Sequence, residues 1–227
     1  MNLDIELVVP LAAILAFDGA LLFFLTWAYY SPRATAYRIS PKTSMNVSAL
    51  KRLLNIAMNS VLSLIIVFGL LSLMAKSMLH GRSDGVVRTV VDVFLILLVY
   101  DFAYYGLHRL MHLKSLMQYV HGVHHRVHNP TAMESFYLHP VELFAGIALL
   151  MTCTLIVGPV SNLSFLFVFA FHSTLNIVVH SGLTTGLWLL RPLDHLMVKH
   201  HIHHRGELDA NLASLTPLPD IVFGTAR

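Results

Sequence analysis

VVDVFLILLVYDFAYYGLHRLMH, residues 90–112, is an apolar stretch that ends in two histidines. Starting near Val86, it has no proline or glycine before Gly106. It is long enough for a helix that crosses a bilayer, which needs roughly 20 residues. His108 and His112 are spaced so that both imidazoles lie on one face of a helix, one turn apart. We expect a membrane-crossing helix that carries two side chains able to reach one metal.

Four other apolar stretches cover residues 5–30, 56–79, 141–157 and 163–179. The last two are joined by Gly158-Pro159-Val160-Ser161-Asn162, which is turn chemistry and predicts a tight helical hairpin. Of the 227 residues, 56% are hydrophobic and 12% charged, and mean hydropathy is +0.68. A soluble domain of this length would need more polar surface.

The fold class expected from these stretches is all-α, a multi-pass integral membrane helical bundle with a cytosolic histidine-rich cap. It would have about four to five spans, including the hairpin. Residues 1–90 would supply N-terminal transmembrane helices, and residues 91–227 the histidine-rich domain, in one structural unit.

Basic residues predict the orientation of the chain. The 31–54 segment has five cations and no acid: Arg33, Arg38, Lys42, Lys51 and Arg52. Because it lies between two apolar spans, a cytoplasmic loop is a better interpretation than a nucleic-acid site. Counting spans from this loop puts both histidine-rich windows and His180 on the cytoplasmic side, and His80 on the other. We expect a bacterial inner membrane or endoplasmic reticulum protein with no nucleic-acid partner.

Histidine is the anomaly of the composition. Eleven of the fifteen fall in two windows, 108–128 and 195–204. Residues 121–125 and 200–204 repeat the spacing HxxHH, whose first and last histidines share a helix face with the other beside it. Two copies of one ligand spacing, together with the HxxxH, predict a two-metal site shared between the clusters. The alternative is a solvated polar surface. The expected metal ligands are His108, His112, His121, His124, His125, His180, His200, His203 and His204, with no catalytic residue beyond them.

His172, Asn176 and His180 form a polar stripe on the last apolar stretch. Polar groups inside a membrane usually face an interior site. His180 is the best ligand candidate of the three, whereas His172, about 12 Å further along the helix, would line a substrate cavity. The full set of groups expected to orient ligands or line that cavity is Asp101, Tyr105, His128, His172, Asn176, His201 and Asn211. We interpret His80, His139 and His195 as ordinary polar groups.

The clusters contain no cysteine, which excludes a thiolate zinc site or an iron–sulfur cluster. No HExxH motif occurs, and acids are scarce around the clusters, which argues against hydrolysis. Imidazole suits iron, copper, nickel and zinc, and a redox pair of metals fits so many imidazoles best. Two alternatives stay open. A membrane haem electron carrier would use His172 and His180, and a metal transporter would use midplane acids such as Asp18.

At this point the sequence resembles the fatty acid hydroxylase and sterol desaturase superfamily of membrane di-iron oxygenases. The resemblance covers about residues 95–227 and rests on an ordered set of motifs. These are DFAYYGLHRLMH at 101–112, HGVHH at 121–125, SFYLHPVE at 135–142, HSG at 180–182, HHIHH at 200–204 and FGT at 223–225.

The resemblance implies two iron ions, which zinc can replace during expression, and dioxygen as co-substrate. It implies a separate electron-donor protein and a lipid substrate, fatty acyl, sterol or isoprenoid, that is hydroxylated or desaturated at a C–H bond.

The chain departs from the family pattern at several positions. Val198-Lys199 stands where a proline usually precedes the last cluster, and Asn211-Leu-Ala replaces Asn-Tyr-Gly. Pro219-Asp220 replaces Trp-Asp, and Asn176 stands where some relatives have a histidine. These departures bear on the substrate and the ligand count rather than on the presence of a metal site.

Overall fold

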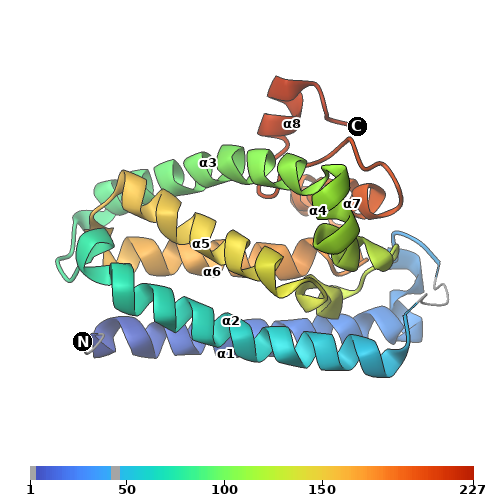
Figure 1. The fold of residues 1–227 in the computed structure, drawn as a ribbon, viewed down its shortest axis with the longest axis horizontal. Helices are drawn as coiled ribbons and strands as arrows, with labels where there is room; N and C mark the ends of the chain where they lie inside the picture. Colours follow the sequence, from blue (N-terminus) through green and yellow to red (C-terminus); the bar gives the residue numbers. More distant parts are fainter. Residues whose placement is uncertain (1–3, 42–46) are drawn as a thin grey trace.

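The computed structural model describes residues 4–41 and 47–227, so Lys42 of the basic segment lies outside the described residues. The long helices run side by side along the longest dimension of the molecule (Figure 1). They are α1 (Ile5–Tyr30), α2 (Ala49–Met78), α3 (Gly85–Met111), α5 (Pro140–Val157) and α6 (Asn162–Val179). Successive long helices run in opposite directions, so the chain returns repeatedly to the same two ends (Figure 1).

The short helices lie in the half of the bundle away from the N-terminus (Figure 1). They are η1 (Pro32–Tyr37), α4 (Lys114–Tyr119), η2 (His121–Arg126), η3 (Ala132–Phe136), η4 (Trp188–Leu190), α7 (Arg191–His204) and α8 (Leu218–Phe223). At the other end, β1 (Leu79–His80) pairs in parallel with β2 (Val160–Ser161), Leu79 opposite Val160. The predicted all-α bundle with a histidine-rich cap is confirmed.

Local sequence explains where these helices begin. The Asp4 side chain accepts from the Glu6 N–H at the start of α1, and the Ser161 hydroxyl accepts from the Ser164 N–H at the start of α6. Such caps satisfy amide groups that have no partner in the first turn. Pro140 occupies the first turn of α5, where its missing N–H costs nothing. The hairpin predicted from residues 158–162 therefore forms with α6 starting at Asn162.

The long helices pack as a ring that is open on one side. α1 packs on α6, α6 on α3, α3 on α5 and α5 on α2. The side chains buried most completely in the shared core come from all five helices: Leu11, Leu71, Ile96, Met151 and Phe165.

Four of these helices, α1, α2, α5 and α6, have the length and hydropathy needed to cross a membrane. The α3 helix, interpreted above as a further span, is not among the four, and Arg88, Asp92 and Asp101 interrupt its apolar sequence. Large side chains stay exposed along the outside of the bundle, among them Phe23 on α1, Ile65 on α2 and Phe171 on α6. Since soluble proteins rarely expose apolar surface on this scale, the surface fits a protein embedded in lipid.

After α7 the chain folds back onto α3, where the buried Asp101 carboxylate holds it. Asp101 accepts hydrogen bonds from the backbone N–H groups of Leu215 (2.8 Å) and Thr216 (3.1 Å), and from the Thr216 hydroxyl (2.6 Å). This acid therefore fixes the backbone of the segment between α7 and α8.

A second buried carboxylate, Asp220, holds the same segment from its other side. It accepts from the backbone N–H groups of Leu212 (2.7 Å) and Ala213 (3.1 Å). It also forms an ion pair with the Lys199 ammonium at 3.0 Å, with side chains 3% and 0% exposed. Charges buried this deeply are tolerated only when each has its partner.

Replacing Asp220 by alanine should lower the free energy of unfolding by about 3–5 kcal/mol, because the buried Lys199 ammonium loses its counter-ion. Denaturation in mixed micelles measures the change. Asp209→Ala, at an exposed aspartate of the same segment, is the matched control and should shift stability by no more than about 0.5 kcal/mol. Equal losses in the two variants would contradict the role given to the buried pair.

Candidate metal centre

Nine histidine rings converge in the cap, in two groups. In each group one ring nitrogen per residue lies within 4.8 Å of the others. The five-histidine group consists of His108, His112, His121, His125 and His203, and the four-histidine group of His124, His180, His200 and His204. These are the nine histidines named as ligands from the sequence. Their coordination of metal stays a prediction.

Each HxxHH motif divides its histidines between the two groups. In residues 121–125, His124 joins the four-histidine group and the outer two histidines join the other group. In residues 200–204 the division is reversed, with His203 in the five-histidine group. The rings of His125 and His204 stack across the boundary, with centroids 4.9 Å apart. The groups are therefore neighbours, and neither motif builds one alone.

Backbone carbonyls orient two rings of the four-histidine group. His124 donates from Nδ1 to the Tyr137 carbonyl at 3.1 Å, and His180 donates from Nδ1 to the Asn176 carbonyl at 2.6 Å. A neutral imidazole has one N–H, so the Nε2 atom of each of these rings carries a lone pair.

The C-terminal segment orients two rings of the five-histidine group in the same way. His108 donates from Nδ1 to the Leu212 carbonyl at 2.7 Å, and His203 donates from Nδ1 to the Ala210 carbonyl at 2.8 Å. Asp101 and Asp220 hold this segment, so the fold of residues 210–216 determines how the two rings point.

The Nε2 lone pairs that these Nδ1 hydrogen bonds leave free point toward neighbouring rings. The Nε2 atoms of His124 and His180 are 3.2 Å apart, and neither has a proton to donate. In the five-histidine group, Nε2 of His112 and of His203 is buried and has no hydrogen-bond partner within the described residues. Two nitrogens bound at a right angle to one metal at about 2.1 Å lie about 3.0 Å apart. A metal cation therefore fits both groups.

Burial keeps these imidazoles neutral at pH 7. It lowers the pKa of His112 and His121 to about 4, and that of His180 and His203 to about 3. The pKa of His200 and that of His204 also fall well below the usual value, again chiefly through burial. Neutral imidazole is the form that binds metal.

The first motif is a 3₁₀ helix, η2, and not the α-helix assumed in the sequence analysis. Its Gly122 lies directly against the end of α4, where an added Cβ would collide with the Met117 carbonyl oxygen. Glycine is therefore required for the tight approach that brings His121 into the five-histidine group.

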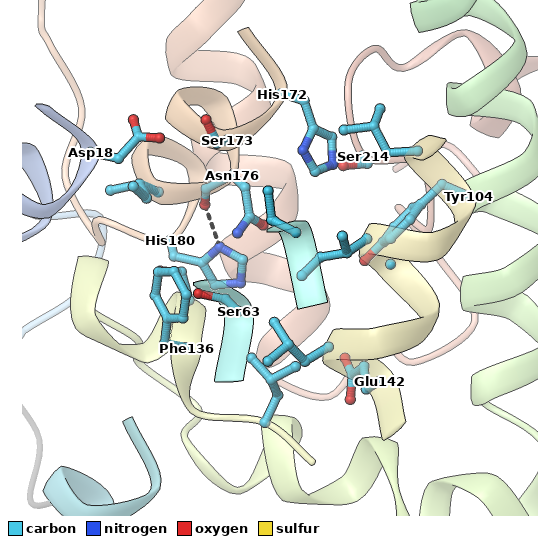
Figure 2. Close-up of a pocket in the computed structure, with 18 of the residues that line it drawn as sticks. Asp18, Ser63, Tyr104, Phe136, Glu142, His172, Ser173, Asn176, His180 and Ser214 are labelled. Carbon is cyan, nitrogen blue, oxygen red and sulfur yellow. Dashed lines mark hydrogen bonds between the residues drawn. The ribbon is translucent and has the colours of Figure 1, made fainter. Parts of the chain in front are cut away.

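A cavity of about 370 Å³ lies among the five long helices and reaches the histidine groups. His108, His121, His124 and His180 line one end of it. Most of its wall is apolar, with side chains that include Leu15, Val67, Leu150 and Phe169. Figure 2 shows polar groups in the wall, among them Asp18, Glu142, His172 and Asn176.

Two of the candidate cavity residues lie in this wall. His172 places Nε2 2.7 Å from the Tyr100 hydroxyl, and the Asn176 side chain lies beside His180 (Figure 2). Neither belongs to a histidine group.

The other candidates lie away from the rings. Asp101 binds the C-terminal segment, the Tyr105 hydroxyl accepts from Arg109 (3.2 Å), and Asn211 Oδ1 accepts from the Arg227 N–H (3.1 Å). His201 places Nε2 3.0 Å from the Ser40 hydroxyl, and His128 is exposed. All five are outside the two groups.

Sequence reasoning missed two residues that reach the centre. Glu142 Oε1 lies 2.8 Å from His121 Nδ1, and its Oε2 is buried without a partner among the described residues. Tyr104, rather than Tyr105, places its ring beside that of His108, with centroids 5.4 Å apart. The sequence did contain an indication of Glu142, because it is the last residue of the SFYLHPVE motif and the one acid in it.

Comparison with known proteins agrees with this centre. The sequence model of the fatty acid hydroxylase family matches residues 93–225. Methylsterol monooxygenase 1 of Rattus norvegicus is 32% identical over 136 residues, which is 55% of this chain and 43% of that protein. Very-long-chain aldehyde decarbonylase GL1-11 of Oryza sativa subsp. indica is 34% identical over 148 residues, 61% of this chain and 53% of that protein.

The chain spans about half the length of these curated relatives, and no solved structure matches it. The matched residues 93–225 make up more than half of the chain and contain all nine grouped histidines. The chain therefore belongs to the fatty acid hydroxylase family, within the superfamily of fatty acid hydroxylases and sterol desaturases.

Proposed function

We propose that this protein is a membrane-bound non-haem di-iron oxygenase that hydroxylates or desaturates a C–H bond of a lipid. The proposal rests on one observation. Two groups of histidines, whose ring nitrogens converge, lie at one end of an apolar cavity. A lipid chain in that cavity would bring a carbon atom to the imidazoles without exposing it to water.

The nine grouped histidines would hold two metal ions, one in each group. The all-nitrogen donor set accepts iron and also zinc, so zinc in a purified sample would not exclude iron in the cell. Iron bound there would supply the redox chemistry with dioxygen, using electrons from a separate donor protein.

The residues of the chain would contribute position and the exclusion of water. The carbonyls of Ala210, Leu212 and Tyr137 hold ligand rings by their outer nitrogens. Glu142 does the same for His121 through a carboxylate. Such outer partners fix the ring orientation and raise the basicity of the ligand.

The alternatives have less support. A haem between His172 and His180 is disfavoured because both lie on one helical segment, with His172 beside Tyr100 and His180 inside the four-histidine group. A transport site is disfavoured because the groups lie at the end of the bundle instead of midway along it.

The substrate class is a lipid, in keeping with relatives whose names give a methylsterol and a very-long-chain aldehyde. We place the histidine groups on the cytoplasmic side, since they share an end of the bundle with η1 and the start of α2, which carry Arg33, Lys51 and Arg52. The host membrane would be the bacterial inner membrane or the endoplasmic reticulum.

Metal analysis of detergent-purified, iron-reconstituted protein tests the centre. Two metal ions per chain are expected, one for each group. His124→Ala or His203→Ala alone should weaken one site, and the double variant should bind neither ion. His195→Ala, at an exposed histidine of the same α7 helix, is the control and should keep both. Metal-free protein after reconstitution would refute the proposal.

Replacing Glu142 by leucine should weaken metal binding by about 10–100-fold, because His121 loses the acceptor that orients it. Glu142→Gln should lose less, since an amide oxygen still accepts from Nδ1. Competition with a chelator gives both affinities. Glu207→Leu, at an exposed glutamate, should bind as the wild type does. Unchanged affinity in Glu142→Leu would show that the carboxylate does not support the ligand.

The oxygenase reaction itself is tested with iron-loaded protein in nanodiscs that contain lipid extract, a chemical electron donor and ¹⁸O₂. Hydroxylation predicts ¹⁸O in a lipid alcohol, whereas desaturation predicts a lipid two hydrogens lighter without ¹⁸O. The His124→Ala/His203→Ala protein should form neither product. A fully iron-loaded enzyme that consumes dioxygen without altering any lipid would contradict lipid oxidation.

A further inference from the structure

The ring of long helices is open on one side. α1 packs along α6 and α2 packs along α5, but α1 and α2 form no comparable contact with each other over the described residues. The cavity lies inside this ring, with α1 and α2 each contributing part of its wall. Both are candidate membrane spans, so the gap between them would face the hydrocarbon of the bilayer.

Exposure of the wall residues locates the opening. Among the described residues that line the cavity, only Gly19 on α1 and Leu64 on α2 are exposed, and all the others are buried or half-buried. Leu64 is 43% exposed. Their neighbours Asp18 and Ser63 turn toward the cavity, one from each helix (Figure 2). One exposed residue on each facing helix is the arrangement expected at a mouth.

The α1 side of this opening has free space. A Cβ added at Gly19 would meet no heavy atom within 4 Å. Nothing in the fold therefore requires glycine there, and glycine inside a helix costs roughly 0.5–1 kcal/mol relative to alanine. On the α2 side, the Ser60 and Ser63 hydroxyls donate to carbonyls of their own helix, at 2.9 and 2.8 Å. A passing apolar chain would leave neither hydroxyl unpaired.

The mouth lies partway along the length of the bundle, away from its histidine end. Asp18, next to Gly19, accepts a hydrogen bond at 2.9 Å from Thr174, six residues before the grouped His180. At 1.5 Å per residue, the mouth is about 9 Å from the histidine end of the cavity, measured along α6. A route at this depth begins among acyl chains and not in water.

We propose that the lipid substrate enters the cavity sideways from the bilayer, through the mouth between α1 and α2 that Gly19 and Leu64 flank. The occupant is a single lipid chain or an apolar ring system, taken directly from the surrounding membrane without a soluble carrier. The inference deepens the proposed function and rests on it, because the route leads to the same histidine centre.

Photolabelling tests the route without using catalysis. Chelator-treated protein in phosphatidylcholine nanodiscs receives a long-chain alcohol with a diazirine in its chain, and mass spectrometry locates the adducts after illumination. Wild-type protein should be labelled at cavity residues such as Ile147 and Ile177, and also at the lipid-exposed Phe171. Gly19→Trp should lose the cavity labels and keep the label at Phe171.

Matched variants separate a blocked mouth from a damaged fold. Leu64→Trp should block from the opposite helix, and Gly19→Ala should leave labelling unchanged. Gly69→Trp places the same ring at an exposed α2 glycine that has equal free space and does not line the cavity. It should label as the wild type does.

Cavity labelling that persists in both Gly19→Trp and Leu64→Trp would overturn the route, as would wild-type protein with no cavity label. Because the protein is metal-free, neither result depends on the oxygenase. Suppose that the ¹⁸O₂ assay gives a lipid product while cavity labelling persists in Gly19→Trp and Leu64→Trp. The entry route would then be wrong, and the proposed function would stand.

Discussion

The hydrogen bond from Nδ1 of a histidine to a backbone carbonyl is the contact on which the centre depends. It forms at His108, His124, His180 and His203. Each bond fixes the tautomer as well as the direction of the ring, so each Nε2 must present a lone pair. Converging lone pairs repel unless a cation lies among them, so the folded cap is well suited to bind metal cations.

The acceptor carbonyls for His108 and His203 lie in a segment without regular structure, between α7 and α8. Such a segment would not hold two rings in place by itself. The buried carboxylates of Asp101 and Asp220 bind its amides, and Lys199 compensates the charge of Asp220. Lys199 is one of the departures from the family pattern, whereas Asp220 is the acid that the chain keeps from the usual Trp-Asp pair, and together they hold the scaffold of the centre.

The sequence alone was sufficient to predict features that depend on short stretches of the chain. The hairpin followed from Gly158-Pro159, and the gathering of the two histidine windows at one end followed from counting apolar stretches. It failed where a contact joins distant positions. Glu142 reaches His121 across 21 residues and Leu212 reaches His108 across 104, and no helical period encodes such pairs. Tyr104 was missed for a different reason. It stands one helical turn before His108 on the same helix, and the sequence analysis named the adjacent Tyr105 instead.

The position of the mouth relative to the centre has a consequence for selectivity. A chain that enters beside Gly19 must turn along α6 to reach His180, and the cavity continues the other way to Phe169. From Phe169 to His180 the wall is about 16 Å long, at 1.5 Å per residue. If substrate enters by this route, the carbon presented to the imidazoles would be set by how much of the molecule fits on each side of the mouth. Shape, more than any single polar contact, would choose the site of oxidation, because most of this wall is apolar.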